Sequence, residues 1–353
     1  MIVDRFFFIF TRFFHLPKQQ PLLRRDRGTY KSNGASPYPL RSHLIPILFP
    51  LLFPAALTAQ QLPVITQYMF SQMAYNPAFA GSSGGICATG LIREQWIGFK
   101  DNGGNKVAPE NIFLTVDAPV KFLHGALGGS VTSDRIGFFR NIGVKIGYAF
   151  RTDLRDGMFS AGAQLNLMNY RIDFSKFQDH LIDPDDPVFQ EYNEKTDLTI
   201  DADLGLYYEV PEKYYIGLSA SQLFQSKAKN TFLQQRRTYY LTGGYNFVIP
   251  GSPAFELKPS ALILFDGAAF QFSIAALLAY NKKFWGGAEY RFQDAVSVLV
   301  GMNIKGFRIG LSYDINTSAL NRYNSGSIEA MLSYCFKIET EKYRKRYKNT
   351  RFL

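Results

Sequence analysis

The sequence of 353 residues contains few of the residue types that carry chemistry. It has two cysteines and four histidines, and the histidines are scattered at His15, His43, His124 and His180. Two cysteines cannot build a zinc site alone, and no nucleophile elbow, phosphate-binding loop or paired-histidine metal motif is present. The sequence therefore predicts no catalytic residue, no metal site and no cofactor, and it argues against an enzyme.

Long apolar runs are also missing from residue 60 onward. A helix that spans a membrane needs about 18 or more consecutive apolar residues, and no later stretch approaches that length. Membrane-spanning helices are therefore not expected in the body of the chain.

Net charge is nearly absent from that body as well, although the whole chain carries +10. Residues 1–59 hold eight Lys/Arg and two Asp, which gives +6, and residues 337–353 hold seven Lys/Arg and two Glu, which gives +5. Residues 60–336 are left with −1. Binding of nucleic acid needs a clustered basic footprint, so nucleic acid is not an expected partner.

The first 59 residues are typical of a leader for export. Residues 44–57 (LIPILFPLLFPAAL) form an apolar stretch after Arg41, and the small residue Ala59 suits the last position before cleavage. Residues 1–59 are therefore predicted to be a leader that includes a signal peptide. The alternative is an N-terminal anchor helix, which the short length and three prolines of the stretch disfavour.

Apolar and polar residues alternate along the body, which also has 21 Tyr and 32 Phe. Between residues 159 and 167, for example, every second residue is Phe, Ala or Leu, and the residues between them are Ser, Gly, Gln and Asn. A period of two is typical of a strand with one apolar face. Fourteen such segments lie near residues 86–98, 109–118, 124–133, 140–150, 157–170, 197–209, 213–224, 236–249, 254–265, 268–281, 283–292, 294–304, 306–315 and 326–336.

The connections between these segments sort by length. Short connections follow even-numbered segments, for example at 152–157 and 305–306. Long ones follow odd-numbered segments, for example at 171–196 and 316–326, with a few short exceptions such as the loop at Gln293. Outer-membrane barrels have an even strand number, short periplasmic turns and longer outside loops. The sequence therefore predicts an all-β fold, a transmembrane antiparallel β-barrel of about 14 strands over residues 86–336, in the cell outer membrane.

Three motifs stand at the start of the exported part: QYMF at 67–70, YNPAFAG at 75–81 and REQW at 93–96. In this order they resemble the PorP/SprF family of the type IX secretion system, and the resemblance extends over about residues 61–336. It implies a barrel of Bacteroidota in contact with outer-membrane lipid, with other type IX secretion or gliding machinery subunits, and with exported surface proteins. The alternative is a general porin or small-molecule transporter.

Residues 60–85 are predicted to form a periplasmic segment ahead of the barrel, with a bend at Asn76-Pro77. One interpretation is that its aromatic side chains pack beneath or inside the barrel mouth, and the other is that it forms a docking edge. The residues assigned to partner binding are Tyr68, Met69, Tyr75, Asn76, Pro77, Gly81, Arg93, Gln95 and Trp96.

Charged residues of both signs fall on the inward faces of the predicted strands. A selective pore more often has one dominant sign at its constriction, so the mixture favours a packed, ion-paired lumen. The inward set is Arg93, Lys145, Arg151, Asp201, Asp203, Glu256, Lys258, Glu289, Arg291, Arg308 and Asp314. The connection 171–196 is predicted either to bind calcium or to form a solvated outside loop, through the acidic residues Asp179, Asp183, Asp185, Asp186, Glu191 and Glu194.

Cys87 opens the first strand and Cys335 nearly closes the last, and these strands are neighbours at the seam of a closed barrel. Alternation turns both thiols inward, and the periplasm allows a disulfide. Barrel shear favours a register shift that would keep the thiols apart, so free thiols are preferred over a disulfide between Cys87 and Cys335. The basic tail 337–353 is predicted to be periplasmic, either solvated or docked on an acidic partner.

Overall fold

The computed structural model describes residues 64–101, 104, 106–173, 194–231 and 233–337. Most of them are in strands. The strands are β1 (Gly85–Glu94), β2 (Glu110–Val120), β3 (Gly125–Ile136), β4 (Phe139–Leu154), β5 (Gly157–Asp173), β6 (Glu194–Val210), β7 (Tyr214–Ser221), β8 (Thr238–Tyr245), β9 (Phe247–Val248), β10 (Phe255–Phe265), β11 (Phe270–Tyr280), β12 (Phe284–Arg291), β13 (Ala295–Ile304), β14 (Phe307–Asn316) and β15 (Ser327–Lys337).

Short 3₁₀ helices are η1 (Gln72–Ala74), η2 (Pro77–Phe79), η3 (Lys121–Leu123) and η5 (Ala319–Arg322). Within the described ranges, no helix has the length and apolar character needed to cross a membrane.

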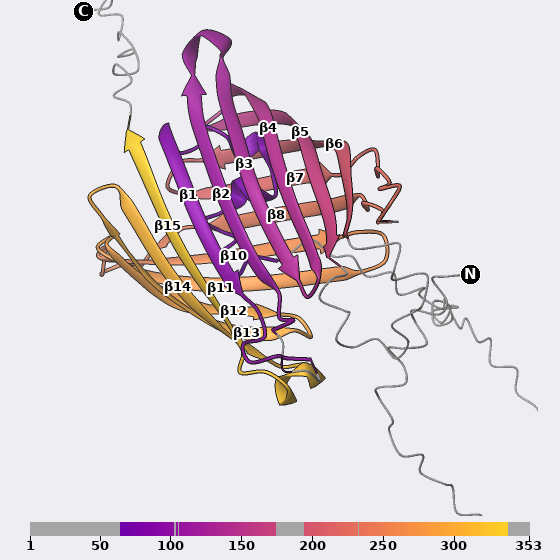
Figure 1. Ribbon diagram of the computed structural model, residues 1–353. Coiled ribbons are helices and arrows are strands. Elements are labelled where there is room, and N and C mark those ends of the chain that lie inside the picture. The colour runs from indigo at the N-terminus through magenta and orange to yellow at the C-terminus, as the bar shows by residue number, and fades with distance from the viewer. Residues whose placement is uncertain (1–63, 102–103, 105, 174–193, 232, 338–353) are drawn as a thin grey trace, which may run out of the picture. The chain divides into compact units, whose positions relative to one another are not determined.

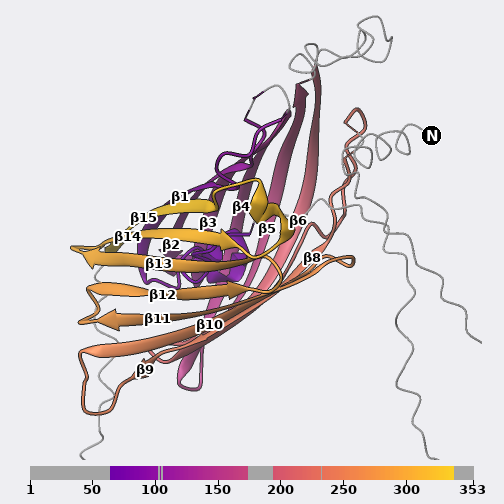
Figure 2. The same ribbon diagram turned by 90° about the horizontal axis from the view of Figure 1, so that it is seen from below.

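The strands form one closed antiparallel sheet (Figures 1 and 2). Neighbours along the chain pair with one another, and β1 pairs with β15 to close the ring. The two residues of β9 continue β8 after Asn246 and pair with β10, so the fifteen elements make a barrel of fourteen strands. The predicted barrel and its strand number are confirmed.

The two ends of the barrel differ in the connections that they carry. The short-turn end carries the turns 155–156, 211–213, 281–283 and 305–306, and the long-loop end carries 95–109, 222–237 and 317–326. Lys305 and Gly306 both have positive φ, at 49° and 87°, which suits the tight hairpins of twisted sheets. The predicted sorting of connections by length is present in the structure, with the short connections 137–138 and 292–294 as exceptions at the long-loop end.

Strands β4, β5 and β6 are longer than the sequence predicts. β5 and β6 have 17 residues each, about 55 Å at the usual rise per residue, whereas β12 has eight. The extra pairs, such as Arg171↔Thr196 and Asp173↔Glu194, lie beyond the apolar stretch of these strands. Figure 2 shows β5 and β6 reaching past their neighbours at the long-loop end.

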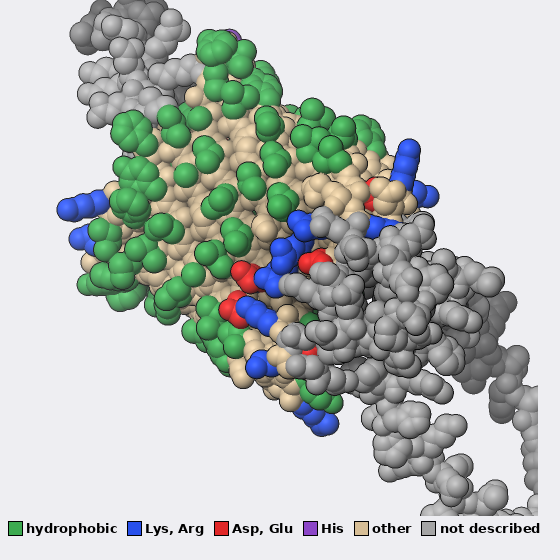
Figure 3. All heavy atoms as spheres, in the orientation of Figure 1, with side chains coloured by type: hydrophobic (Ala, Val, Ile, Leu, Met, Phe, Trp, Pro, Cys, Tyr) green, Lys and Arg blue, Asp and Glu red, His purple; other side chains and the backbone are tan. Residues whose placement is uncertain are grey.

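The outer wall of the barrel is apolar and the inner wall is polar. On β6, the side chains of Leu198, Ile200 and Leu204 are more than half exposed, whereas Asp201 and Asp203 are fully buried. Apolar side chains are spread over most of the visible face of the wall in Figure 3. This inversion of an ordinary soluble fold is what a lipid-facing barrel requires.

Exposed and half-buried aromatic rings lie along the short-turn end on β6 to β11 and on β14 and β15. Neighbouring rings lie within about 4 to 6 Å of each other in the pairs Tyr208–Tyr214, Tyr214–Tyr245, Tyr245–Phe247, Phe255–Tyr280 and Phe307–Tyr334. Amphipathic aromatic rings favour the boundary between hydrocarbon and water. They mark one membrane interface at this end.

Candidate functional site: a plug in the lumen and a clamped seam

The chain ahead of β1 lies inside the barrel. We call residues 64–81 the plug; η1 and η2 belong to it, and Figure 2 shows these elements within the ring of strands. All of its side chains are buried except those of Met69, Phe70, Ala74 and Phe79, which are half-buried. The plug contacts β2, β6, β10 and β15, so it reaches walls on opposite sides of the lumen.

A cluster of buried charges holds the plug near the long-loop end. The Thr66 and Gln67 amides donate to the two carboxylate oxygens of Glu329, at 2.9 and 2.8 Å. Arg93 pairs with Asp314 at 2.7 Å and with Glu329 at 3.2 Å, and it donates to the Thr66 hydroxyl. Three strands and the plug therefore meet through one guanidinium group.

Arg291 adds a second guanidinium to this cluster. It donates to the Thr66 hydroxyl at 3.0 Å and lies 3.6 Å from Glu289 and 3.7 Å from Asp314. The two arginines have side chains 1 to 2% exposed. Buried ion pairs add little net stability, but removing one partner leaves an uncompensated buried charge, so the arginines and carboxylates of this cluster depend on one another.

The bend at Asn76-Pro77 fits the wall of β5, β6 and β7. The Asn76 side-chain oxygen accepts from the Ala78 amide at 2.9 Å and caps η2, and its amide group donates to the Leu206 carbonyl at 3.0 Å. The wall has glycines here. A Cβ at Gly162 would lie 2.5 Å from the Ala78 nitrogen, and a Cβ at Gly205 would collide with Asn76. These glycines let the plug backbone approach the strands.

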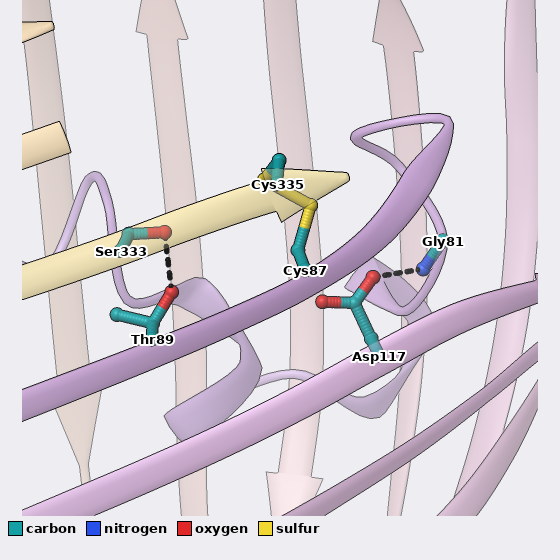
Figure 4. The surroundings of a disulfide bond; sticks show 6 residues. All are labelled: Gly81, Cys87, Thr89, Asp117, Ser333 and Cys335. Carbon is teal, nitrogen blue, oxygen red and sulfur yellow. Dashed lines mark hydrogen bonds between the residues drawn. A yellow bond between two sulfur atoms is a disulfide. The ribbon is translucent and has the colours of Figure 1, made fainter. Parts of the chain in front are cut away.

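The lower end of the plug is held by Asp117 and Arg151. The Gly81 amide donates to Asp117 at 2.7 Å, as Figure 4 shows, and Arg151 donates to the Ala80 carbonyl at 3.1 Å while it pairs with Glu209 at 2.8 Å. Between the two ends, the Tyr68 hydroxyl hydrogen-bonds to Ser260 at 3.0 Å. The plug is therefore anchored along its whole length.

The connection between β7 and β8 also enters the lumen at the long-loop end. Asp203 pairs with Lys145 at 2.9 Å and accepts from the amide of Gln222 at 2.8 Å. Further along this connection, Gln235 is buried and donates to the Tyr170 hydroxyl at 3.0 Å. These opposite charges on the inner wall are paired with each other and with backbone, as the predicted ion-paired lumen requires. Arg308 of the same predicted set instead lies over the ring of Phe70, 4.7 Å from its centroid.

A cavity of about 220 Å³ remains beneath the plug at the short-turn end. Its lining includes Met69 of the plug and Tyr207, Tyr215, Lys258 and Leu277 of the wall. Because Met69 lies in its lining, the cavity borders the plug.

The seam between β1 and β15 is joined by a ladder of inward pairs. From the short-turn end upward they are Cys87↔Cys335, Thr89↔Ser333, Leu91↔Met331 and Arg93↔Glu329. The cysteines form a disulfide and Thr89 donates to Ser333 at 2.8 Å (Figure 4). Arg93 pairs with Glu329 at 3.2 Å. The seam is thus covalent near one end and ion-paired near the other.

A family model for the type IX secretion system membrane protein PorP/SprF matches residues 57–334. The chain belongs to the PorP/SprF family. With the lipid-facing barrel described above, this membership places the protein in the bacterial outer membrane. It also ties the protein to the type IX secretion system.

No curated protein matches this PorP/SprF chain. Solved structures that it resembles include the outer-membrane protein Omp33 of Acinetobacter baumannii, with 10% identity over 72% of this chain and 99% of that one and a TM-score of 0.43. A deletion mutant of the monoaromatic hydrocarbon channel TodX has 12% identity, coverage of 75% and 94%, and a TM-score of 0.48. The toluene transporter TodX of Pseudomonas putida has 10% identity, coverage of 76% and 93%, and a TM-score of 0.44.

The residues predicted to bind a partner do not form one surface in this PorP/SprF barrel. Tyr68, Met69, Tyr75, Asn76, Pro77 and Gly81 lie in the plug, and Arg93 lies in the charge cluster. Gln95 and Trp96 are half-buried at the long-loop end, where the Trp96 amide donates to the hydroxyl of Ser327. The interpretation that the aromatic residues pack inside the barrel describes the structure, and a docking role for these residues stays a prediction.

The expected register shift at the seam is wrong. Cys87 and Cys335 are direct partners with Cα atoms 4.1 Å apart, close to the spacing of a non-hydrogen-bonded antiparallel pair. Barrel shear describes the stagger summed around the whole ring. It does not fix the register between any two particular strands, which depends on the contacts between those two strands. The structure therefore contains the disulfide that the sequence argument ranked second.

Three sequence predictions lie outside the described residues. They are the leader 1–59, the basic tail from residue 338 onward, and the acidic connection 174–193. In the part of the chain that the structure describes, no group of three or more His, Cys, Asp or Glu residues could hold a metal ion.

Sequence reasoning missed Thr66, Gly162 and Glu329 as parts of the site. Gly162 was placed on the inward face by alternation, but nothing in a strand pattern shows that a plug lies against that face. A glycine among inward-facing polar residues could have indicated the contact, because glycine weakens a strand and often marks a site where another backbone approaches closely.

Proposed function

We propose that this chain is a non-enzymatic scaffold in the outer membrane. It anchors or assists the export of surface proteins or gliding adhesins, together with other subunits of the type IX machinery. The observation that supports this most is the plug: residues 64–81 occupy the lumen and are bonded to β2, β6, β10 and β15. A barrel filled in this way serves as a platform rather than as a conduit.

The rival function is that of a general porin or small-molecule transporter, which needs a continuous aqueous path. The purified protein should therefore be recorded in planar lipid bilayers. We expect no large, stable openings from the wild type, because the plug and the connection between β7 and β8 both enter the lumen. Stable openings of wild-type protein would support the porin instead.

Partner binding is proposed for the half-buried members of the predicted set at the long-loop end, Gln95 and Trp96, whereas the members in the lumen hold the plug in place. Trp96 packs edge-on against Phe99, with ring centroids 6.1 Å apart, and it is partly exposed at the long-loop end. Tyr323, in the connection 317–326 at the same end, is 58% exposed and serves as a matched control.

Outer membranes should be crosslinked and the barrel purified with its attached proteins. Trp96→Ala should reduce recovery of machinery subunits or exported proteins, and Tyr323→Ala should leave it unchanged. Equal recovery from the wild type and both variants would remove Trp96 from the docking role. Thermal unfolding of each variant shows whether a loss comes from binding or from folding.

A further inference from the structure

The outer wall carries a row of basic side chains at the long-loop end. Arg135 of β3 and Arg140 of β4 are direct cross-strand partners beside the short connection 137–138, and Arg140 is also the direct partner of Arg171 of β5. These side chains face outward, because successive residues alternate and the neighbours Asp134 and Asn141 face the lumen. Figure 3 shows charged side chains of both signs along one edge of the apolar wall, at the long-loop end of the strands in front. We call Arg135, Arg140 and Arg171 the arginine row.

The arginine row lies at the edge of the lipid-facing band. On β4 the outward residues below Arg140 are Ile142, Val144 and Ile146, and Tyr148 follows towards the short-turn end. Aromatic rings mark the membrane interface at the short-turn end, so the arginine row stands at the opposite boundary of the apolar band. A basic side chain on the lipid face is costly at the middle of the membrane and costs little at this boundary. The phosphate groups of lipids lie at the same depth.

The positive charge of the row is not balanced by carboxylates of the wall. Among the described residues, no carboxylate lies within ion-pair distance of the Arg135 or Arg140 guanidinium. Glu110, the direct partner of Arg135 on β2, lies 3.7 Å from Lys106 instead. Like charges directly opposite each other destabilise a sheet. The arrangement therefore favours a ligand that brings negative charge to the row.

The geometry of the row fits a phosphate group. Directly opposite residues have Cβ atoms about 4.5–5.5 Å apart, so two neighbouring guanidinium groups can reach the same phosphate. Arginine binds phosphate oxygens through two parallel N–H donors, which makes it the preferred residue for this contact. Apolar surface continues directly below the row, where the side chains of Ile142 and Ile146 are 52% and 65% exposed. A phosphate that is attached to acyl chains would use both surfaces at once.

We propose that Arg135 and Arg140, with Arg171 beside them, bind the phosphate groups of an anionic lipid in the leaflet at the long-loop end. The headgroup contacts the guanidinium groups, and the acyl chains lie along Ile142 and Ile146. A free phosphate ion would use the arginines alone. If the long loops face outward, the lipid belongs to the outer leaflet.

Lipid A, which carries phosphate groups on a sugar headgroup with acyl chains, is the probe for this site. The purified barrel in detergent is titrated with lipid A, and the bound lipid is counted by native mass spectrometry. The test variant is Arg135→Gln, Arg140→Gln. The control is Arg155→Gln, Arg322→Gln, which removes the same charge from exposed side chains, one in the turn 155–156 and one in η5.

Wild type and control should bind lipid A with the same dissociation constant. The test variant should bind with a constant at least about tenfold larger, which is the loss expected for one charge-assisted hydrogen bond. Equal constants for the test variant and the wild type would overturn the proposal. Inorganic phosphate at the same concentration should leave the lipid bound, and displacement would show a site for a free anion instead.

Urea unfolding provides a second measurement that does not depend on counting lipid. Without lipid, the test variant should keep the wild-type midpoint, because the substitution removes opposed like charges from the wall. Lipid A should then raise the midpoint of the wild type and of the control, since it binds only the folded barrel, and it should leave the test variant unchanged. An equal rise in all three proteins would contradict binding at the arginine row.

Discussion

Gly162→Ala should displace the plug from its seat on β5. The added Cβ would lie 2.5 Å from the Ala78 nitrogen and 2.6 Å from the Pro77 carbonyl carbon. Ordinary contacts of a Cβ begin at 3.4 Å, and both neighbours are backbone atoms that cannot rotate away. Overpacking of this kind costs about 1–3 kcal/mol, so the free energy of unfolding should fall by that amount.

Gly243→Ala is the matched control for this substitution. Gly243 is a strand glycine on β8, and the nearest atom to its added Cβ, the Tyr215 carbonyl oxygen, is 3.7 Å away. Both substitutions restrict the unfolded chain equally, which by itself stabilises by about 0.4–1 kcal/mol. The difference between the two variants therefore isolates the collision with the plug.

Urea unfolding of the purified barrels in detergent, followed by circular dichroism, measures this difference. Fluorescence of Trp285 reports on the plug separately, because its ring lies 4.7 Å from that of Phe70, and Trp96→Phe removes the other tryptophan. We expect a lower midpoint and a changed Trp285 emission for Gly162→Ala alone. Equal urea midpoints for Gly162→Ala and Gly243→Ala would refute the close contact between the plug and β5.

Three further outcomes are expected. Arg93→Met should lower the free energy of unfolding by about 3–5 kcal/mol, because Asp314 and Glu329 lose their shared partner. As a control in the same urea titration, Lys106→Met removes the half-exposed ion pair with Glu94 and should change the free energy of unfolding by less than about 1 kcal/mol. Non-reducing gels and thiol labelling of the denatured wild type should show no free thiol, and two free thiols would exclude the disulfide. Cys87→Ser should lower the free energy of unfolding by about 5 kcal/mol, because the disulfide closes a loop between residues 248 positions apart in the sequence. Protease added to intact cells should cut within 171–196 if the long-loop end faces outward, and cutting only after the outer membrane is opened would reverse the orientation.

Most of the wall was predictable because its pattern is local. The strand near 197–209 was expected from alternation alone, and β6 spans Glu194–Val210. Its carboxylates Asp201 and Asp203 were placed inward, where they are fully buried. Because every second residue of each strand faces lipid and is apolar, each strand can be recognised from its own sequence alone.

The site was less predictable because it depends on contacts between distant segments. Thr66 meets Glu329 across 263 residues of sequence, and Asn76 meets Leu206 across 130. The bend at Asn76-Pro77 was expected, but a bend carries no information about what surrounds it. For the same reason, the pairing of Cys87 with Cys335 could be proposed but not preferred.

The sequence by itself determined a barrel wall of fourteen strands, its apolar outer face and its charged inner face, since each follows from periodicity within a strand. Only the tertiary structure decided that residues 64–81 run down the lumen, that inward glycines of β5 and β6 receive their backbone, and that the first and last strands meet in register. Those features arise when the sheet closes. Closure brings together residues whose spacing along the chain bears no relation to their separation in space.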